Sequence, residues 1–279
     1  MSLMFGLIAA LAWGIHDLLV RHVSQRSHLL TALLVVLASG ALVVAPVAAA
    51  YGDWSAITPR SYGLSIATGA CFGLASLGLY GAFAIGPVRL VAPIVGAFPV
   101  LSVGWASVNG IPVTVPEFVA VLAIVAGVAL VAILSNDTRN RGERAHAITL
   151  ALLAALGFAT TFAFGQAASR LGADFPVILC TRAAAVAAMA LLLLATRGGQ
   201  RPAAALFPPL VLMGVLDTTA LGLVTAAGSL DRSEYAAVAA SLFGLITILL
   251  ARVFLHEPMT RGKWGAAVMV FVGIGYLGF

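Results

Sequence analysis

The stretch LMFGLIAALAWGIHDLLV, residues 3–20, is an apolar run that carries His16 and Asp17 side by side near its end. A membrane-spanning helix needs about 20 predominantly apolar residues, and this run approaches that length. No positive residue precedes the run, so we expect a retained first helix and not a cleaved signal peptide. A charged group inside a membrane helix needs a partner, a water-filled cavity or neutralisation, so the two polar residues indicate a functional site.

The composition of the whole chain supports a membrane location. Of its 279 residues, 62% are hydrophobic and 9% are charged, and the mean hydropathy is +1.09. A soluble domain would carry roughly a quarter charged residues, so the chain is expected to be an integral membrane protein. Its pI of about 9.8 does not indicate nucleic-acid binding, because the basic residues are scattered over short loops and not gathered on one face. They are expected to meet the headgroups of the lipid bilayer.

Counting apolar runs of spanning length gives ten transmembrane helices in an all-α membrane protein. The runs are 3–20, 29–50, 61–85, 90–108, 118–134, 147–168, 175–196, 205–230, 235–251 and 264–279. The polar segment SNDTRNRGERAH, residues 135–146, separates five runs from five. We therefore expect a first repeat over 1–134, a polar connection over 135–146 and a second repeat over 147–279.

The two halves also match in sequence. A shift of 145 residues places GLIAALAWGI (6–15) over ALLAALGFAT (151–160), and a shift of 146 places IPVTVPEF (111–118) over EPMTRGKW (257–264). Both offsets are nearly equal, which indicates an internal duplication. Because each copy holds an odd number of helices, two copies in one membrane must lie inverted.

Several motifs resemble the EamA-type members of the drug/metabolite transporter superfamily. They are the Trp-Gly of the first helix (Trp13, Gly14), Arg182 in ILCTRAAAV, and the Leu-x-Glu-x-x-Thr hairpin formed by Leu255, Glu257 and Thr260 in LHEPMTRGKWGAAVMVFVGI. The first half departs from this pattern, with Ile111 in place of the glutamate and Leu37 in place of the arginine. The halves have therefore diverged, and functional polarity is expected mainly in the second.

The resemblance implies export of small organic solutes, chiefly amino acids or related metabolites, without a cofactor. It also implies a location in a bacterial inner membrane with both termini in the cytoplasm. The aromatic candidates below favour a flat or apolar substrate, as in the YddG-like aromatic amino-acid exporters. Of 15 Lys and Arg residues, however, 11 lie at odd-numbered connections and three at even-numbered ones, and the positive-inside rule then places the termini outside the cytoplasm. The orientation therefore stays open.

Eight residues are candidates for substrate binding. They are Trp13, His16, Asp17, Tyr80, Phe158, Thr161, Asp217 and Tyr235. Trp13 shares a helix face with His16 and Asp17, which are three and four residues away. This face lines a solute path, or it lies at the level of the headgroups, where Trp and His are common.

Trp13 and Phe158 occupy equivalent positions in the two repeats, so they either form an aromatic pair that selects the substrate or simply pack between helices. Asp217 either contacts the substrate or forms a structural ion pair with Arg182. Pro93 and Pro99 interrupt the fourth run and bend it, which makes this helix a candidate gate.

Other classes of function find less support. Cys71 and Cys180 lie within apolar runs as small hydrophobic residues, without the spacing of a metal site or disulfide. No HExxH, GxSxG, paired-carboxylate or Walker motif occurs, so neither an enzyme nor an ATP-driven pump is predicted. A channel would be expected to show a ring or filter element, which the sequence does not reveal. The sequence therefore predicts a secondary transporter that exports amino acids, including aromatic ones, by alternating access. The alternative is a broad drug or cationic-metabolite carrier. Proton coupling, direction and oligomeric state stay open, and a monomer is compatible with the sequence.

Overall fold

The computed structural model describes residues 1–279 except 102–103, 105–112, 135–140, 197–198, 232–233 and 278–279. The helices of the first half are α1 (Ser2–Ser24), α2 (Leu29–Tyr51), α3 (Pro59–Ile85), α4 (Val88–Gly96) and α6 (Val115–Leu134). Those of the second half are α7 (Arg141–Arg170), α8 (Asp174–Thr196), α9 (Phe207–Ala226), α10 (Glu234–Ser241), α11 (Phe243–Phe254) and α12 (Arg261–Leu277). Three short 3-10 helices, η1 (Trp54–Ala56), η2 (Ala204–Leu206) and η3 (Ala227–Ser229), lie at loops.

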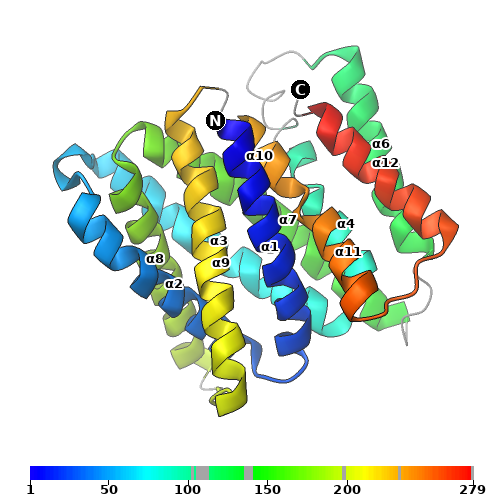
Figure 1. Ribbon diagram of the computed structural model, residues 1–279, viewed down its shortest axis with the longest axis horizontal. Helices are drawn as coiled ribbons and strands as arrows, with labels where there is room; N and C mark the ends of the chain where they lie inside the picture. The colour runs from blue at the N-terminus through cyan, green and yellow to red at the C-terminus, as the bar shows by residue number, and fades with distance from the viewer. Residues whose placement is uncertain (102–103, 105–112, 135–140, 197–198, 232–233, 278–279) are drawn as a thin grey trace.

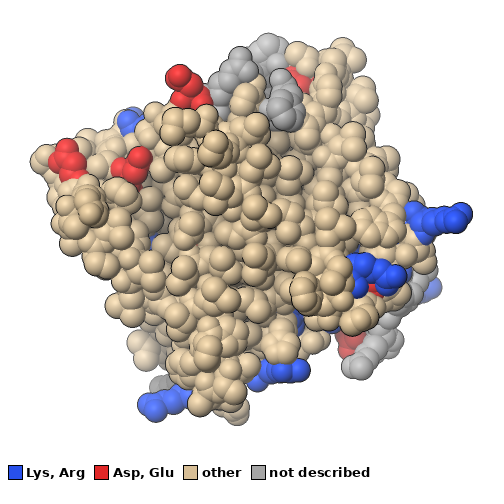
Figure 2. All heavy atoms as spheres, in the orientation of Figure 1, with Lys and Arg blue, Asp and Glu red and all other residues tan. Residues whose placement is uncertain are grey.

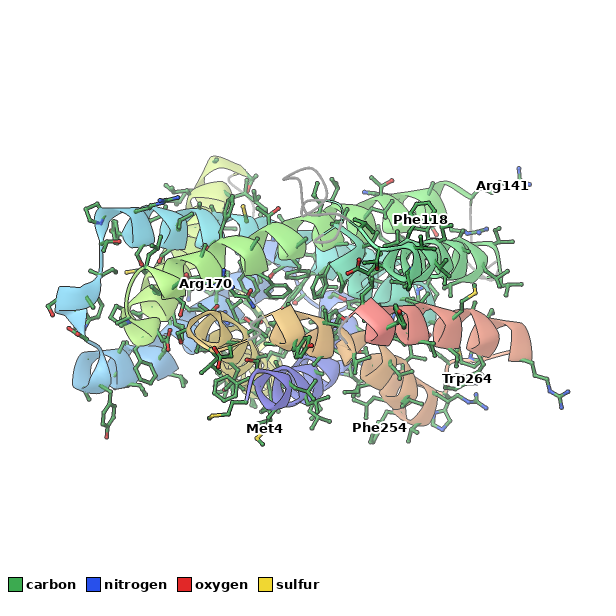
Figure 3. The ribbon with its side chains drawn as sticks, turned by 90° about the horizontal axis from the view of Figure 1, so that it is seen from above. Met4, Phe118, Arg141, Arg170, Phe254 and Trp264 are labelled. Carbon is green, nitrogen blue, oxygen red and sulfur yellow. The ribbon has the colours of Figure 1, made fainter. Side chains whose placement is uncertain are left out.

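The expected all-α membrane architecture is confirmed in the part of the chain that the structure describes. Each of the ten predicted runs contains a helix, and seven helical segments are long and apolar enough to cross a membrane. Large apolar side chains cover the outside of the bundle, as Met4 and Phe254 show in Figure 3. Leu42 is 75% exposed and Leu194 is 73% exposed. Such a surface suits hydrocarbon, where apolar side chains are favoured and every backbone polar group is paired within its helix.

The two ends of the bundle differ in charge. Both termini lie at one end (Figure 1), and Figure 2 shows acidic side chains gathered there. We call this the acidic end; it includes Asp53 and Asp174, which line one groove. The opposite end holds the α1–α2 loop, the α3–α4 turn and the segment 255–260, and we call it the basic end.

The fourth helix of each half is interrupted. The prolines predicted an interruption within 90–108, whereas a continuous helix was expected over 235–251. α4 ends at Gly96 and a turn follows at residues 97–98, directly before Pro99, which has no N–H to continue the helical bonding. In the second half, Leu242 separates α10 from α11 without any proline. The remainder of the run to 108 lies largely outside the described residues.

These interrupted helices cross in close contact. A Cβ atom on Gly96 would lie 3.2 Å from the carbonyl oxygen of Ser241, and one on Gly244 would lie 2.8 Å from that of Ala92. Glycine therefore permits the backbones to approach at the crossing.

Packing between the halves follows matched pairs of helices. α3 of the first half packs on α7 and α8 of the second. In the matching contacts, α9 of the second half packs on α1 and α2 of the first, and α6 packs on α12. Two glycine contacts repeat this pattern in detail. A Cβ on Gly69 would lie 2.2 Å from the Thr181 carbonyl oxygen, and one on Gly214 would lie 2.5 Å from that of Val36. Positions 69 and 214, like 36 and 181, are 145 residues apart, the same offset as in the sequence match of the two halves.

Candidate functional site

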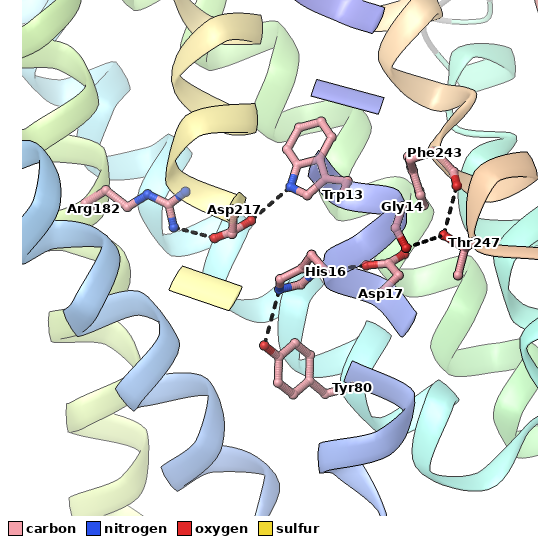
Figure 4. A network of polar contacts seen from close by, with 9 residues as sticks. All are labelled: Trp13, Gly14, His16, Asp17, Tyr80, Arg182, Asp217, Phe243 and Thr247. Atoms are coloured by element: carbon pink, nitrogen blue, oxygen red, sulfur yellow. Dashed lines mark hydrogen bonds and ion pairs between the residues drawn. The ribbon is translucent and has the colours of Figure 1, made fainter. Parts of the chain in front are cut away.

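A buried polar cluster lies where α1, α8 and α9 meet (Figure 4). The indole Nε1 of Trp13 donates to Asp217 Oδ1 at 2.9 Å, and Arg182 Nη1 donates to Asp217 Oδ2 at 2.5 Å. Arg182 is fully buried and Asp217 is 3% exposed. Both oxygens of the Asp217 carboxylate are thus held, and the cluster joins two helices of the second half to α1 of the first.

Arg182 is incompletely paired by this contact. Its guanidinium carbon lies 5.0 Å from the centroid of the Phe72 ring, within the range of a cation–π interaction. Its Nε and Nη2 atoms are buried and have no hydrogen-bond partner among the described residues. The guanidinium of Arg182 can therefore donate hydrogen bonds in addition to its bond to Asp217.

His16 and Asp17 form a second polar group on α1. Nδ1 of His16 lies 3.0 Å from Asp17 Oδ1, and the Tyr80 hydroxyl lies 3.5 Å from His16 Nε2. Asp17 is 1% exposed, and its Oδ2 atom has no hydrogen-bond partner in the described structure. Both His16 and Asp17 are therefore buried inside the bundle. Whether this face lines a solute path or lies at the level of the headgroups stays a prediction.

Aromatic rings from both halves surround the two polar groups. Trp13 lies 5.5 Å from Phe162 and 6.2 Å from Phe243 between ring centroids. Phe158 lies 6.3 Å from Phe162 in a stacked arrangement, and Phe72 lies 5.9 Å from Phe158. These separations fall in the range in which aromatic pairs attract one another.

The central pocket lies between these rings and the acidic groups. Its volume is about 20 Å³, which suffices for about one water molecule and not for an organic solute. Its lining includes Ser76 and Leu79 of α3 in addition to side chains of α1, α7, α9 and α11. The structure is therefore closed around the site, and a solute enters only if helices move apart.

The candidates from the sequence divide into those that line this pocket and those that do not. Five of them line it, namely Trp13, His16, Asp17, Phe158 and Asp217. Tyr80 is fully buried next to the pocket and reaches it through His16. Thr161 is buried but donates its hydroxyl to the Gly157 carbonyl of its own helix. Tyr235 is half-buried near the start of α10 and does not line the pocket.

The proposed gating prolines also lie outside the lining. Pro93 is buried within α4, and Pro99 follows the turn after that helix. A role in gating therefore stays a prediction. Cys71 and Cys180 are free and half-buried.

Sequence analysis did not select four aromatic residues in or beside the pocket. These are Phe72, Phe98, Phe162 and Phe243. Phe162 lies one helical turn after Phe158, and Phe98 and Phe243 are 145 residues apart, like Trp13 and Phe158. Extending the repeat offset to the fourth helices would have identified the latter pair.

Comparison with known proteins agrees with this architecture. Residues 145–279 match the EamA-like transporter family. No curated protein matches the chain by sequence. A solved structure titled only "Crystal structure of protein" is similar in fold over 99% of this chain and 95% of its own, with a TM-score of 0.71 and 17% sequence identity. That likeness concerns the fold alone.

The EamA-like match ends at residue 279 and begins just before the second set of five predicted helices. Together with the apolar helices, it identifies an integral membrane protein. The second half of this chain, residues 145–279, is similar to the EamA-like transporter family.

Proposed function

We propose that the whole chain is a secondary transporter that exports small organic solutes, among them aromatic amino acids, across a bacterial inner membrane. The observation that carries this proposal is the closed central pocket, because aromatic rings from both halves and the carboxylates of Asp17 and Asp217 meet there. A transported solute must contact both halves if their relative movement is to expose it to either side of the membrane.

The chemistry of the pocket matches an amino acid with an apolar side chain. The Oδ2 atom of Asp17 is a buried acceptor without a partner among the described residues and suits an ammonium group. Arg182 is the cationic group next to Asp217, and it suits a substrate carboxylate. The rings of Trp13 and Phe162 offer an apolar wall for the side chain. A buried polar atom without a partner costs about 1–3 kcal/mol, so a ligand that satisfies it gains affinity.

The packing of the helices supports alternating access by two inverted repeats. Helix pairs between the halves are matched, and the contacts of Gly69 and Gly214 repeat at an offset of 145 residues. In an inverted repeat, each half supplies the same type of contact at opposite membrane faces. The interruptions after α4 and between α10 and α11 are positions at which such helices can bend. Pro93 and Pro99 are the candidate hinges in the first half.

A carrier of lipophilic cations is the second candidate function, and one groove favours it. A mostly apolar groove of about 710 Å³ runs along α2, α8 and α9, and Asp53 and Asp174 line it at the acidic end. Hydrogen bonds from the hydroxyl and the amide of Ser55 hold the pKa of Asp53 below its usual value. Asp53 is therefore ionised at neutral pH and attracts cations.

Transport into proteoliposomes tests both candidates. The purified chain is reconstituted, and uptake of labelled phenylalanine, tryptophan, threonine and a lipophilic quaternary amine is compared, with and without a pH gradient. We expect phenylalanine and tryptophan to enter faster than into protein-free vesicles. Uptake of the quaternary amine alone would favour the second candidate and contradict the first. The arm with a pH gradient distinguishes proton coupling from facilitated diffusion.

A further inference from the structure

A second, larger hollow lies at the basic end and shares no residue with the central pocket. Its volume is about 600 Å³, and side chains from both halves line it, including Arg21, Arg89, Glu143 and Glu257. We call it the basic vestibule. The basic vestibule is open, whereas the central pocket is closed. The contacts in the wall of the vestibule therefore separate the central pocket from the basic end.

Glu257 makes the main charged contact between the halves in this wall. Its Oε1 accepts from the N–H of Val88 at 3.0 Å, and its Oε2 accepts from the N–H of Arg89 at 3.2 Å. The Arg89 Nη1 atom donates to the same Oε2 at 3.3 Å. Both side chains are largely buried. One carboxylate of the second half thereby caps the N-terminus of α4 in the first half and pairs with its arginine.

The segment that carries Glu257 is itself held in place. The N–H of Leu255 bonds the Ala251 carbonyl at 3.0 Å as α11 ends. His256 follows in the left-handed region, with φ of 54°, which is uncommon for a residue other than glycine. Arg252 Nη1 then donates to the Glu257 carbonyl at 3.2 Å. A segment fixed at these points cannot follow α4 freely, so movement of α4 away from α11 must break the carboxylate contact.

Two described contacts between the halves at the acidic end are neutral. The Ser61 hydroxyl donates to the Ala168 carbonyl at 2.9 Å, and the Ser2 hydroxyl donates to the Asp231 carbonyl at 2.7 Å. Both are neutral hydrogen bonds between the halves. The first-half position that matches Glu257 is Ile111, which lies outside the described residues and whose side chain has no carboxylate. Hydrogen bonds to charged groups are stronger than neutral ones, so the Glu257 contact is stronger than either of these two bonds.

We propose that Glu257 is a positioning residue that holds the basic end closed, and that release of α4 from its carboxylate opens the central site toward the basic vestibule. This inference rests on the alternating-access part of the proposed function and not on the identity of the solute. Breaking the contact favours the form open to the basic end, because it removes bonds made only in the closed form.

Cysteine labelling from one membrane face at a time tests the inference without any solute. Cys71 and Cys180 are first replaced by alanine, and Ser76→Cys places a thiol in the lining of the central pocket with little change in size. Gly142→Cys at the basic end and Ser55→Cys at the acidic end, in separate samples, show which face of the vesicle is which. The rate at which the Ser76→Cys variant reacts with a membrane-impermeant maleimide is then measured from each face.

With Glu257→Gln, we expect labelling from the basic end to rise roughly tenfold, since replacing a charge-assisted bond by a neutral one costs about a factor of ten. Labelling from the acidic end should stay equal or fall. Glu143→Gln is the matched control, because it removes an exposed carboxylate that lines the same vestibule and makes no hydrogen bond to α4 among the described residues. It should leave both rates unchanged.

Three results would overturn the inference: an equal rise from both faces, which is general loosening; no change from the basic face; or the same rise with Glu143→Gln. Glu257→Asp, with its shorter reach, should give a smaller rise than Glu257→Gln, and a larger rise would also count against the inference. Because no solute is used, a failure of amino-acid transport leaves this result standing, and the two proposals fail separately.

Discussion

The indole nitrogen of Trp13 donates a hydrogen bond to the carboxylate of Asp217 across 2.9 Å, and this bond joins the first helix of one half to the third helix of the other. The other oxygen of Asp217 is held by Arg182. An aromatic wall of the pocket is thus fixed by the same carboxylate that neutralises a buried arginine. Substitutions at these three positions are therefore expected to have coupled effects on the free energy of unfolding. Their effects on transport are expected to differ from one another.

The first prediction concerns the pair of Arg182 and Asp217. Asp217→Asn leaves the fully buried guanidinium without its counter-charge, and Arg182→Leu leaves the carboxylate held by Trp13 alone. Losing one partner of a buried pair costs about 3–5 kcal/mol. Each single variant should therefore lower the midpoint of thermal unfolding in detergent, and the double variant should recover part of the loss.

Asp53→Asn serves as the control for these variants, because Asp53 is exposed and its hydrogen bonds in the described structure lie within its own loop. It should leave the unfolding midpoint nearly unchanged. Additive losses in the double variant, or normal stability of both single variants, would contradict the structural ion pair and favour separate roles in transport.

The fold was more predictable than the site. Hydrophobic length alone located the helices, since the hydrocarbon excludes irregular backbone that faces lipid. The break at Leu242 was missed because no proline marks it. It lies two residues before Gly244, where the helices cross closely. Trp13 and Phe158 were found through the repeat offset, yet Trp13 contacts Phe162, one turn further along α7. An alignment of the repeats identifies equivalent positions in the two halves. Which aromatic rings are in contact depends on how each helix is rotated about its axis, which the alignment does not specify.

The second prediction concerns the close contact of α3 with α8. At Gly69, a Cβ would lie 2.2 Å from the Thr181 carbonyl oxygen, so Gly69→Ala must push the helices apart. Overpacking of this kind costs about 1–3 kcal/mol. Thermal unfolding in detergent should show the loss, and Gly214→Ala should show a similar one, because the equivalent contact to Val36 is also tight.

Gly63→Ala is the control on the same helix, because nothing lies within 4 Å of its Cβ position. Because alanine lowers the backbone entropy of the unfolded chain, this variant should be neutral or stabilised by about 0.4–1 kcal/mol. Equal destabilisation by Gly63→Ala and Gly69→Ala would mean that the close helix crossing at Gly69 does not decide the effect.

The third prediction concerns the two faces of α1. His16 is 4% exposed and lines the central pocket, whereas its neighbour Ile15 is 42% exposed on the outside of the bundle. In a background without native cysteines, His16→Cys should react with a polar thiol reagent whenever the pocket opens, and Ile15→Cys should stay protected by lipid. The rates are measured in reconstituted vesicles. Equal protection of both positions would remove the argument for a water-accessible pocket.

The last prediction concerns the selectivity that Trp13 gives the pocket. Its ring contacts Phe162 and Phe243, and aromatic contacts of this kind contribute about 0.5–1.5 kcal/mol beyond burial. If the ring of a substrate uses the same wall, Trp13→Ala should lower phenylalanine transport about two- to tenfold more than threonine transport. Trp13→Phe keeps an aromatic ring and removes the bond to Asp217, so it should preserve most of the preference while losing stability. Competition between the two amino acids in proteoliposomes measures the ratio, and circular dichroism confirms that each variant is folded. An unchanged ratio in Trp13→Ala would mean that the ring only packs between helices, because all solutes would then suffer alike.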